Sequence, residues 1–312
     1  MTKTTKAPYE NISTQSLAII LVNWFSYEVT RNCLISLKDL NYLNYSIIVV
    51  DNASEDGSGE RLKNEFSEII YLSNEQNLGF TGGNNVGIKL ALESGFDLIM
   101  LLNNDTVVTP DFASILIGTL NSDPMIGAVQ PKIRLNKNRD VIWNAGSYFN
   151  SFLATSKSRG YGEIDKSQYD EQMNLPWITG CCFLTSSEII KEVGLLDQRF
   201  FCYYEDTDWS FKIRKLGFRL VYEPGALIYH EVGMSNEKNK VSGEGNLSPF
   251  SHYVTVRNHL YIVRRYSRGI NMIGAWTNQV FKFIGYCGYF LLRRRFTKLK
   301  AVLKGFKEGL TT

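Results

Sequence analysis

The chain has 312 residues, of which 44% are hydrophobic and 21% are charged. This length allows one large domain or two, and this composition excludes a disordered, collagen-like or disulfide-scaffold protein. The five cysteines form no Cys-x-x-Cys pair, which excludes a zinc ribbon and favours reduced thiols in the cytoplasm. Residues 1–15 lack the apolar core of a signal peptide, and we expect them to form a flexible N-terminus.

The net charge of +3 is unevenly distributed along the chain. From Arg257 to the C-terminus, 12 basic residues and one acidic residue, Glu308, give a net charge of +11, so the rest of the chain carries −8. A basic tail on a mildly acidic body indicates that the tail meets an anionic partner.

Apolar runs alternate with helical patterns in the first half of the chain. The apolar runs cover residues 17–22, 47–50, 69–72 and 98–102, and the helical patterns between them cover 27–40, 58–66 and 84–93. This alternation is typical of βαβ units. It predicts an α/β fold with a mostly parallel central sheet that is buried on both faces by helices.

The second half has a different pattern. Residues 132–176 are rich in Asn, Ser, Tyr and Gly, which predicts loops and short strands laid over the sheet. A buried strand over 177–185, a helix over 205–216 and a last strand over 220–230 are predicted next. From Pro249 onward the pattern is helical again, so we expect a C-terminal helical extension.

Residues 270–292 are mostly apolar and long enough for a transmembrane helix. Polar residues near the middle and three glycines argue against a simple span. Lys282 within this segment and Arg293–Arg295 directly after it favour a helix at the surface of an anionic membrane. The alternative is a helix packed on the domain or in a homodimer contact. We expect a cytoplasmic protein that is peripheral on the inner face of the cell membrane and binds no nucleic acid.

Polar residues follow three of the apolar runs, where ligands bind in an open parallel sheet. Asn23 follows the first run, Asp51 and Asn52 follow the second, and 103–105 follow the fourth, so we expect them to converge. A carboxylate at Asp51 can accept hydrogen bonds from a base or a ribose, although it is also a good turn residue. Asp105 can ligate a hard divalent cation that bridges phosphates, or it can cap a helix.

The glycine-rich segment 77–85 is predicted to open a helix. Its glycines allow close backbone approach, and a helix N-terminus favours an anion. The segment is neither a P-loop nor a dinucleotide-binding fingerprint, because the glycine spacing differs and no Gly-Lys-Ser/Thr follows.

An acidic cluster and a histidine are the remaining candidates. Glu205, Asp206 and Asp208 lie close together, and a carboxylate crowded by acids and aromatic rings should have a raised pKa, which suits a general base. The alternative is that these acids only complement a helix dipole. His230 ends the last predicted strand and can either complete a metal site or be structural.

In their order and spacing, the segments 49–54, 77–85, 102–106, 180–183 and 203–209 resemble the inverting glycosyltransferases of family 2, which have the GT-A fold. Gly-Phe-Thr-Gly-Gly-Asn-Asn at 79–85 looks most like the rhamnosyltransferase branch. The resemblance covers roughly residues 17–266. It implies a catalytic domain over 16–248 (nucleotide-binding half 16–131, acceptor-binding half 132–248), followed by a basic, aromatic-rich helical region over 249–312.

The resemblance also implies roles for single residues. Asp206, beside Glu205, matches the proposed catalytic base, and Asp51 matches the acid that reads the nucleotide base. Asp105 matches the last acid of the Asp-x-Asp metal motif. Asn103 stands where the first acid is usual, so Asp105 is the main expected carboxylate ligand. His230 matches a late histidine that some family members use near the metal or the diphosphate, and Arg257 lies in a segment similar to a basic motif that contacts the diphosphate. The other expected donor contacts are Asn23, Asn52, Gly82, Gly83, Asn84 and Asn104, and the expected acceptor contacts are Trp177, Gly180, Cys181 and Asp208.

The implied function is transfer of a sugar with inversion, in cell-surface polysaccharide synthesis. The expected donor is dTDP-rhamnose or another dTDP- or UDP-sugar, the acceptor a glycan or lipid-linked sugar, and the cofactor Mg²⁺ or Mn²⁺. A sugar-1-phosphate nucleotidyltransferase is disfavoured because 23–26, and not a basic Gly-rich loop, follows the first strand. A non-catalytic carbohydrate-binding protein would not need the acidic cluster.

Overall fold

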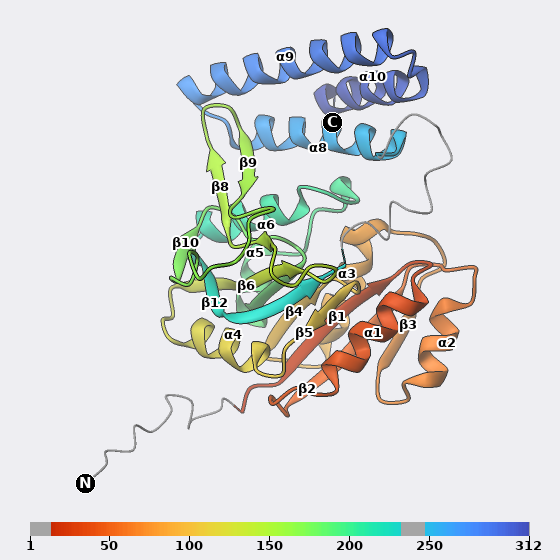
Figure 1. Cartoon of the computed structure of the whole chain (residues 1–312), viewed down its shortest axis with the longest axis vertical. Coiled ribbons are helices and arrows are strands. Elements are labelled where there is room, and N and C mark those ends of the chain that lie inside the picture. The colour runs from red at the N-terminus through yellow and green to blue at the C-terminus, as the bar shows by residue number, and fades with distance from the viewer. Residues whose placement is uncertain (1–13, 232–246, 312) are drawn as a thin grey trace.

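The structure is a computed structural model that describes residues 14–231 and 247–311. Nearly all of the N-terminal segment expected to be flexible, 1–15, lies outside the described residues. Figure 1 shows a central sheet with helices on both faces and three further helices stacked at one end of the molecule. The expected α/β architecture with a C-terminal helical region is confirmed.

The first four strands are parallel, as the alternation of apolar runs and helices predicts. They lie in the order β4-β1-β2-β3 within the sheet. The strands are β1 (Leu17–Asn23), β2 (Tyr45–Asp51), β3 (Ile70–Ser73) and β4 (Leu98–Leu102), and the helices between them are α1 (Tyr27–Leu37), α2 (Ser58–Glu65) and α3 (Gly79–Glu93).

Beyond β4 the sheet is mixed. β11 (Cys182–Ser186) runs antiparallel to β4 and to β6 (Ile126–Leu135), and β12 (Arg219–His230) runs parallel to β6. The remaining elements are β5 (Thr106–Val108), α4 (Phe112–Asn121), β7 (Ile142–Asn144), β8 (Ser147–Asn150), β9 (Thr155–Ser158), β10 (Met173–Leu175), α5 (Ser187–Val193), η1 (Gln198–Phe200) and α6 (Glu205–Lys215).

The strand predicted over 177–185 begins only at Cys182. The backbone N–H groups of Ile178, Thr179 and Gly180 donate to the side chains of Ser210, Gln130 and Asp206. Because these donors bond to side chains and not to a neighbouring strand, residues 177–181 form a loop that leads into the start of β11.

The sheet separates two hydrophobic cores. Alternate residues of β1 point to opposite faces, with Leu17, Ile19 and Leu21 in one core and Ala18 and Ile20 in the other. Helices α1, α2 and α4 close the first core, and α3, α5 and α6 close the second. Both cores hold the strand ends of the first half in place.

The C-terminal helices α8 (Pro249–Tyr266), α9 (Ile270–Leu292) and α10 (Phe296–Thr311) stack above the sheet, and the β8–β9 hairpin reaches up to α9 (Figure 1). Asn278 Nδ2 donates to the carbonyl oxygen of Leu153 at the hairpin tip, at 2.8 Å. A Cβ at Gly274 would lie 2.5 Å from the Phe152 carbonyl oxygen, so a glycine is needed for this close contact. Within the described ranges, no helix combines the length and apolarity needed to cross a bilayer.

All five cysteines are free thiols. Cys33, Cys181 and Cys182 are buried in the cores, and burial raises the pKa of the Cys33 thiol to about 12. These three side chains are therefore protonated and serve as small apolar residues.

Candidate active site

A buried hydrogen-bond chain joins the ends of three strands. Asn104 Nδ2 donates to Thr30 Oγ1 (2.6 Å), and Thr30 Oγ1 donates to Asn23 Oδ1 (3.0 Å). Asn23 Nδ2 then donates to Asp51 Oδ1 (2.7 Å). The predicted convergence of Asn23, Asp51 and the segment after β4 is thus confirmed. Thr30 connects them, and no pattern in the sequence singles it out.

Asp51 lies at the centre of this polar edge and is 3% exposed. Besides Asn23, the backbone N–H of Ser54 donates to its Oδ2 at 2.9 Å. Each carboxylate oxygen can accept two hydrogen bonds, so capacity remains for a ligand donor. A Cβ at Gly59 would lie 2.6 Å from Asp51 Cγ, so α2 can approach the carboxylate only because residue 59 is glycine.

Asn52 has a different role from the donor contact that we expected. Its Nδ2 donates to Asn77 Oδ1 and to the Gly79 carbonyl oxygen, and its Oδ1 accepts from Asn74 Nδ2 and the Leu78 N–H. All four hydrogen-bonding positions of the amide are filled. Asn52 therefore fixes the β3–α3 loop and has no free group for a nucleotide.

The glycine-rich segment is the first part of a helix and not an open cradle. Helix α3 begins at Gly79, five residues before the predicted start. The N–H of Gly82 donates to the Leu78 carbonyl oxygen, so it is not available to a phosphate. A Cβ at Gly83 would lie 2.9 Å from Val22 of β1, which shows that this glycine allows close packing on the sheet. Asn84, also expected at the donor, is buried and donates to the Phe80 carbonyl oxygen at 2.8 Å.

Asp105 and His230 lie together because β5 pairs with the end of β12, with Thr106 opposite His230. The Nε2 atom of His230 lies 3.1 Å from Asp105 Oδ1, and the ring of Trp143 packs edge-on against the imidazole. This 3.1 Å contact is not a hydrogen bond: in the described part of the chain, Asp105 Oδ1 and His230 Nδ1 are buried without a hydrogen-bond partner.

A two-ligand site of this kind fits a divalent cation that is completed by a substrate. No group of three His, Cys, Asp or Glu side chains that could hold a metal occurs among the described residues. Mg²⁺ is commonly held by one or two carboxylates together with substrate phosphates and water. Asp105 and His230 therefore suit a cation that arrives with a diphosphate.

Glu205 and Asp206 begin α6, and they differ in accessibility. Glu205 is 6% exposed, and its Oε2 is buried with no hydrogen-bond partner among the described residues. Asp206 is partly exposed; its Oδ2 accepts from the Gly180 N–H (2.9 Å) and its Oδ1 from the Thr207 N–H (2.6 Å). Burial raises the pKa of Asp206, and burial together with the Asp206 charge raises the pKa of Glu205 well above its usual value.

The turn before these acids has unusual backbone conformations. Phe201, Tyr203 and Tyr204 have φ angles of 62°, 67° and 71°, in a region that non-glycine residues rarely occupy. From α8, the Nδ2 atom of Asn258 donates to the carbonyl oxygens of Phe200, Cys202 and Tyr203, each at 2.8 Å. Such strain persists only where the surrounding structure enforces it, and it is common at active sites. The hydrogen bonds from Asn258 hold this turn in its strained conformation. No sequence motif predicts this role for Asn258.

Arg257 also donates hydrogen bonds to the turn before α6. We had expected it to contact a diphosphate. Its Nη2 donates to the carbonyl oxygens of Arg199 (2.9 Å) and Phe200 (3.0 Å), and its Nη1 donates to Tyr253 Oη (2.9 Å). These hydrogen bonds attach α8 to the 199–204 turn, and the contact of Arg257 with a diphosphate stays a prediction.

A short loop contacts both the chain segment that leads to Asp105 and the acidic residue Asp206. The N–H of Asn103, at the end of β4, donates to the Cys181 carbonyl oxygen at 2.8 Å, and the adjacent Gly180 donates to Asp206. Gly180 was expected to contact an acceptor; the structure shows that it orients Asp206. The loop 180–181 thus contacts both Asn103, two residues before Asp105, and the Asp206 carboxylate.

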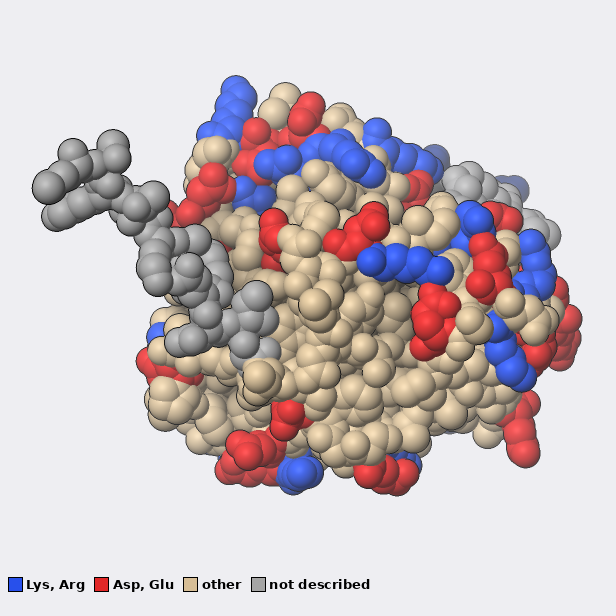
Figure 2. Space-filling view, turned by 90° about the horizontal axis from the view of Figure 1, so that it is seen from below, with Lys and Arg blue, Asp and Glu red and all other residues tan. Residues whose placement is uncertain are grey.

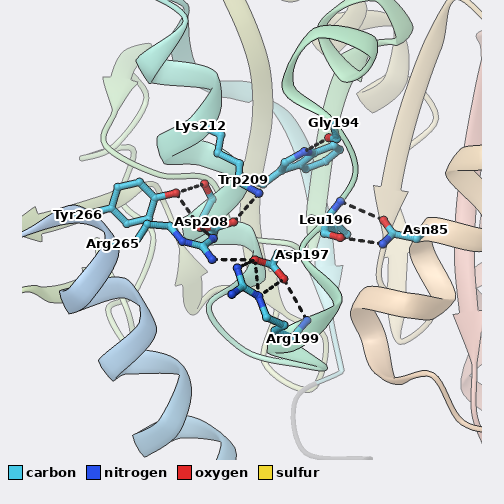
Figure 3. Close-up of polar contacts among 10 residues, drawn as sticks. All are labelled: Asn85, Gly194, Leu196, Asp197, Arg199, Asp208, Trp209, Lys212, Arg265 and Tyr266. Carbon is cyan, nitrogen blue, oxygen red and sulfur yellow. Dashed lines mark hydrogen bonds and ion pairs between the residues drawn. The ribbon is translucent and has the colours of Figure 1, made fainter. Parts of the chain in front are cut away.

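Three of the other expected acceptor contacts are occupied elsewhere. Asp208 is 1% exposed and is paired with Lys212 and Arg265, and Tyr266 Oη donates to it at 2.7 Å (Figure 3). Cys181 is buried in the core, and Trp177 is buried with its indole N–H donated to the Tyr148 carbonyl oxygen. Asp208 is thus ion-paired with Lys212 of α6 and Arg265 of α8, and its contact with an acceptor stays a prediction.

Comparison with known proteins agrees with this geometry. Residues 16–194 match the family model "Glycosyl transferase family 2". The chain is 26% identical over 220 residues to a poly-beta-1,6-N-acetyl-D-glucosamine synthase of Staphylococcus aureus, covering 69% of this chain and 50% of that protein. The chain therefore spans about half the length of such curated relatives.

Solved structures show the same fold. The structure of GalNAc-T7 with UDP, GalNAc and Mn²⁺ superposes with a TM-score of 0.63 at 17% identity, over 82% of this chain and 48% of that one. Mannosyltransferase PcManGT from Pyrobaculum calidifontis, with GDP-Man and Mn²⁺, superposes with a TM-score of 0.57 at 12% identity, over 98% and 91%. The architecture is thus the GT-A fold. The chain belongs to glycosyl transferase family 2.

Proposed function

We propose that this protein transfers a sugar from a nucleoside-diphosphate donor to a glycan or lipid-linked acceptor, with inversion at the anomeric carbon. The observation that carries the proposal is that the loop 180–181 contacts both Asn103, at the start of the segment that carries Asp105, and the Asp206 carboxylate, while Asp105 lies 3.1 Å from His230. The family match supports the same activity. The proposal assigns the donor to the half 16–131 and the acceptor to the half 132–248.

The residues have separate tasks in this reaction. Asp51, held by Asn23 and the Ser54 N–H, accepts hydrogen bonds from the nucleoside. Asp206 accepts the proton of the acceptor hydroxyl as that oxygen attacks the anomeric carbon, while the bond to the diphosphate breaks. Mg²⁺ or Mn²⁺ held by Asp105 and His230 would supply positive charge beside the leaving diphosphate. A single displacement needs no nucleophilic residue of the protein.

For the donor we propose dTDP-rhamnose, and for the biological role the synthesis of a cell-surface polysaccharide. The segment 79–85 supports the donor through its likeness to rhamnosyltransferases. The relative whose name describes a glucosamine polymer synthase supports the role. Release of nucleoside diphosphate from a panel of dTDP- and UDP-sugars, with metal present, tests both the donor and the activity. A nucleotidyltransferase would release no nucleoside diphosphate from these donors, but would release pyrophosphate when given a nucleoside triphosphate and a sugar 1-phosphate. A binding protein would release neither product.

Substitution of Asp105 by Ala tests the metal pair. We expect a chelator to weaken the affinity of the unmodified protein for dTDP and UDP at least about tenfold, because one charged contact contributes about that much. The Asp105→Ala variant should bind weakly with or without the chelator. Asp39→Ala, which removes an exposed carboxylate elsewhere, is the control. Nucleotide affinity that is indifferent to chelator in both variants and in the unmodified protein would contradict the proposal.

We further propose that the enzyme docks on an anionic membrane through α9. Large apolar side chains spaced 3 and 7 residues apart, with adjacent pairs at 280–281 and 291–292, lie on one face of α9 and are 46–85% exposed. We call this set the α9 stripe. Its members are Ile270, Ile273, Val280, Phe281, Ile284, Leu291 and Leu292.

The charges around the stripe support a lipid surface as its partner. Exposed basic residues follow the stripe at Arg293 and Arg294 and continue on α10 at Lys300, Lys304 and Lys307. Each basic residue near an anionic membrane contributes about 1 kcal/mol. Figure 2 shows the opposite end of the molecule, where basic side chains lie beside acidic ones around an uncharged area. The net charge of +11 from Arg257 onward belongs to the C-terminal helices, which include the α9 stripe.

Co-sedimentation with vesicles tests the docking. The unmodified protein should sediment with anionic vesicles and not with neutral ones, and added salt should weaken the binding. Phe281→Ser/Ile284→Ser should weaken it at least about tenfold, because both side chains lose their burial in lipid. The control, Leu43→Ser/Ile164→Ser, removes two equally exposed apolar residues elsewhere. Unchanged sedimentation of the stripe variant would refute the docking; a dimer that this variant dissociates would assign the stripe to a second copy.

A further inference from the structure

A cavity of about 320 Å³ lies outside the catalytic site, where the end of α6, the β8–β9 hairpin and the α8–α9 turn meet. Three aromatic rings line it in a continuous row. Phe149 packs edge-on against Phe211, with ring centres 5.0 Å apart, and Phe211 packs edge-on against Tyr266 at 4.9 Å.

Three cationic side chains also line this cavity: Arg214, Lys215 and Arg268. In the part of the chain that the structure describes, none of them is paired with a carboxylate. Arg214 reaches only the Pro176 carbonyl oxygen at 3.4 Å, and Arg268 reaches the Ser267 carbonyl oxygen at 2.8 Å. The neighbouring Arg265, in contrast, is neutralised by Asp197 and Asp208.

The dipole of α6 does not explain the whole set. Arg214 and Lys215 stand in the last turn of α6, where cations are favoured by the helix dipole. Arg268 follows α8 and donates to the carbonyl oxygens of Arg264 and Ser267 at the C-terminus of that helix, so the ends of two different helices bring cations to one cavity. Three uncompensated cations beside aromatic rings make a site for an anion that carries an apolar or sugar portion.

We propose that this cavity binds the phosphate group of the acceptor, at the position where a phosphate links the acceptor sugar to its lipid carrier. This inference rests on the proposed transferase function. Asn271 lines the cavity and follows Ile270, the first residue of the α9 stripe, so the cavity lies beside the proposed membrane surface. Arg214 is eight residues beyond Asp206 on α6, which separates their backbones by about 12 Å. The phosphate would therefore be held apart from the reacting hydroxyl.

Binding of two probes, farnesyl phosphate and inorganic phosphate, tests the proposal without requiring turnover. Both are titrated into the full-length protein in the absence of donor, and into the Asp105→Ala variant to exclude binding at the donor site. Lys215→Gln/Arg268→Gln should weaken farnesyl phosphate binding at least about tenfold, because two charged contacts are lost. The control is Lys89→Gln/Lys191→Gln, which removes two exposed lysines that have no acidic partner among the described residues.

The outcomes separate the possible sources of the phosphate. Farnesyl phosphate that binds at least about tenfold more tightly than inorganic phosphate, with the loss confined to the cavity variant, supports a lipid-linked acceptor. Equal affinities that the cavity variant weakens support an anion site for a soluble phosphate and overturn the lipid assignment. Binding that is absent, that the control weakens equally or that Asp105→Ala abolishes overturns the site. Failure of the transferase function itself would appear separately, as absent nucleotide binding and donor turnover.

Discussion

Replacing Asp206 with Asn is expected to lower turnover at least about 100-fold, in line with the usual contribution of a general base. The amide keeps the shape, but it has a single acceptor oxygen, so it can accept from only one of the Gly180 and Thr207 N–H groups, and it cannot take a proton. Nucleotide affinity should stay unchanged, because Asp206 does not belong to the Asn23–Asp51 network. Steady-state kinetics with titration of the nucleotide measures both quantities.

Glu205→Gln is the matched control for this substitution. Burial and the Asp206 charge raise the pKa of Glu205 well above its usual value, which favours its protonated form. Glutamine imitates that protonated form, and we expect turnover to remain close to that of the unmodified enzyme. An inactive Glu205→Gln variant beside an active Asp206→Asn variant would move the base by one residue.

The pH profile follows from the same carboxyl group. Burial raises the pKa of Asp206, so the basic form is populated only above an elevated pKa. Activity should therefore increase with pH through that pKa and then level off. The folded state binds this proton more tightly than the unfolded chain, so the Asp206 contribution to stability decreases as pH rises through the same range. Asp206→Asn should remove this decrease in a pH series of unfolding experiments.

The sequence was sufficient to predict the first half of the fold and the edge at which the site lies. Apolar runs buried on both faces, such as β1, and the helices between them leave few topologies other than a parallel sheet. Since parallel strands end at one edge, the polar residues that follow β1, β2 and β4 had to meet. The hydrogen-bond chain from Asn104 to Asp51 is the physical result.

Residue type alone could not separate ligand contacts from structural ones. Arg257, Asn52 and Asp208 have the chemistry of binding residues, yet each is satisfied by partners within the protein. For Arg257 these partners are carbonyl oxygens 57 and 58 residues earlier in the chain, which no local pattern can reveal. Asn258 and Thr30 are the reverse case, since both position the site through long-range hydrogen bonds and carry no motif.

The glycines of α3 illustrate the same limit. A glycine-rich turn before a helix is compatible with phosphate binding and with close packing. The close approach of Gly83 to Val22 shows that this glycine serves packing. This approach depends on where α3 crosses β1, which the sequence does not reveal. The helix start at Gly79 is equally non-local, because the Thr81 N–H donates to the carbonyl oxygen of Phe201 from the turn before α6.

Replacing Arg265 with Ala is expected to lower the free energy of unfolding by about 2–4 kcal/mol, a large effect for one residue. Arg265 joins α8 to the rest of the molecule through Asp208 and Asp197 (Figure 3). Although burial opposes ionisation, hydrogen bonds from Arg199 and Arg265 hold the pKa of Asp197 below its usual value. Without Arg265, the carboxylate of Asp208 stays buried with only Lys212 to balance it.

Arg219→Ala is the matched control, because Arg219 pairs with Asp123 at the surface, where the two side chains are 42% and 43% exposed. An exposed pair of this kind contributes less than about 1 kcal/mol. Chemical denaturation of both variants measures the difference. Adding Asp208→Asn to Arg265→Ala should recover part of the lost free energy of unfolding by removing the unbalanced charge.

Equal losses for Arg265→Ala and Arg219→Ala would show that the buried network does not hold α8. Asn258 of α8 holds the turn before Asp206. Loosening α8 by Arg265→Ala should therefore also lower turnover at temperatures where the protein is still folded.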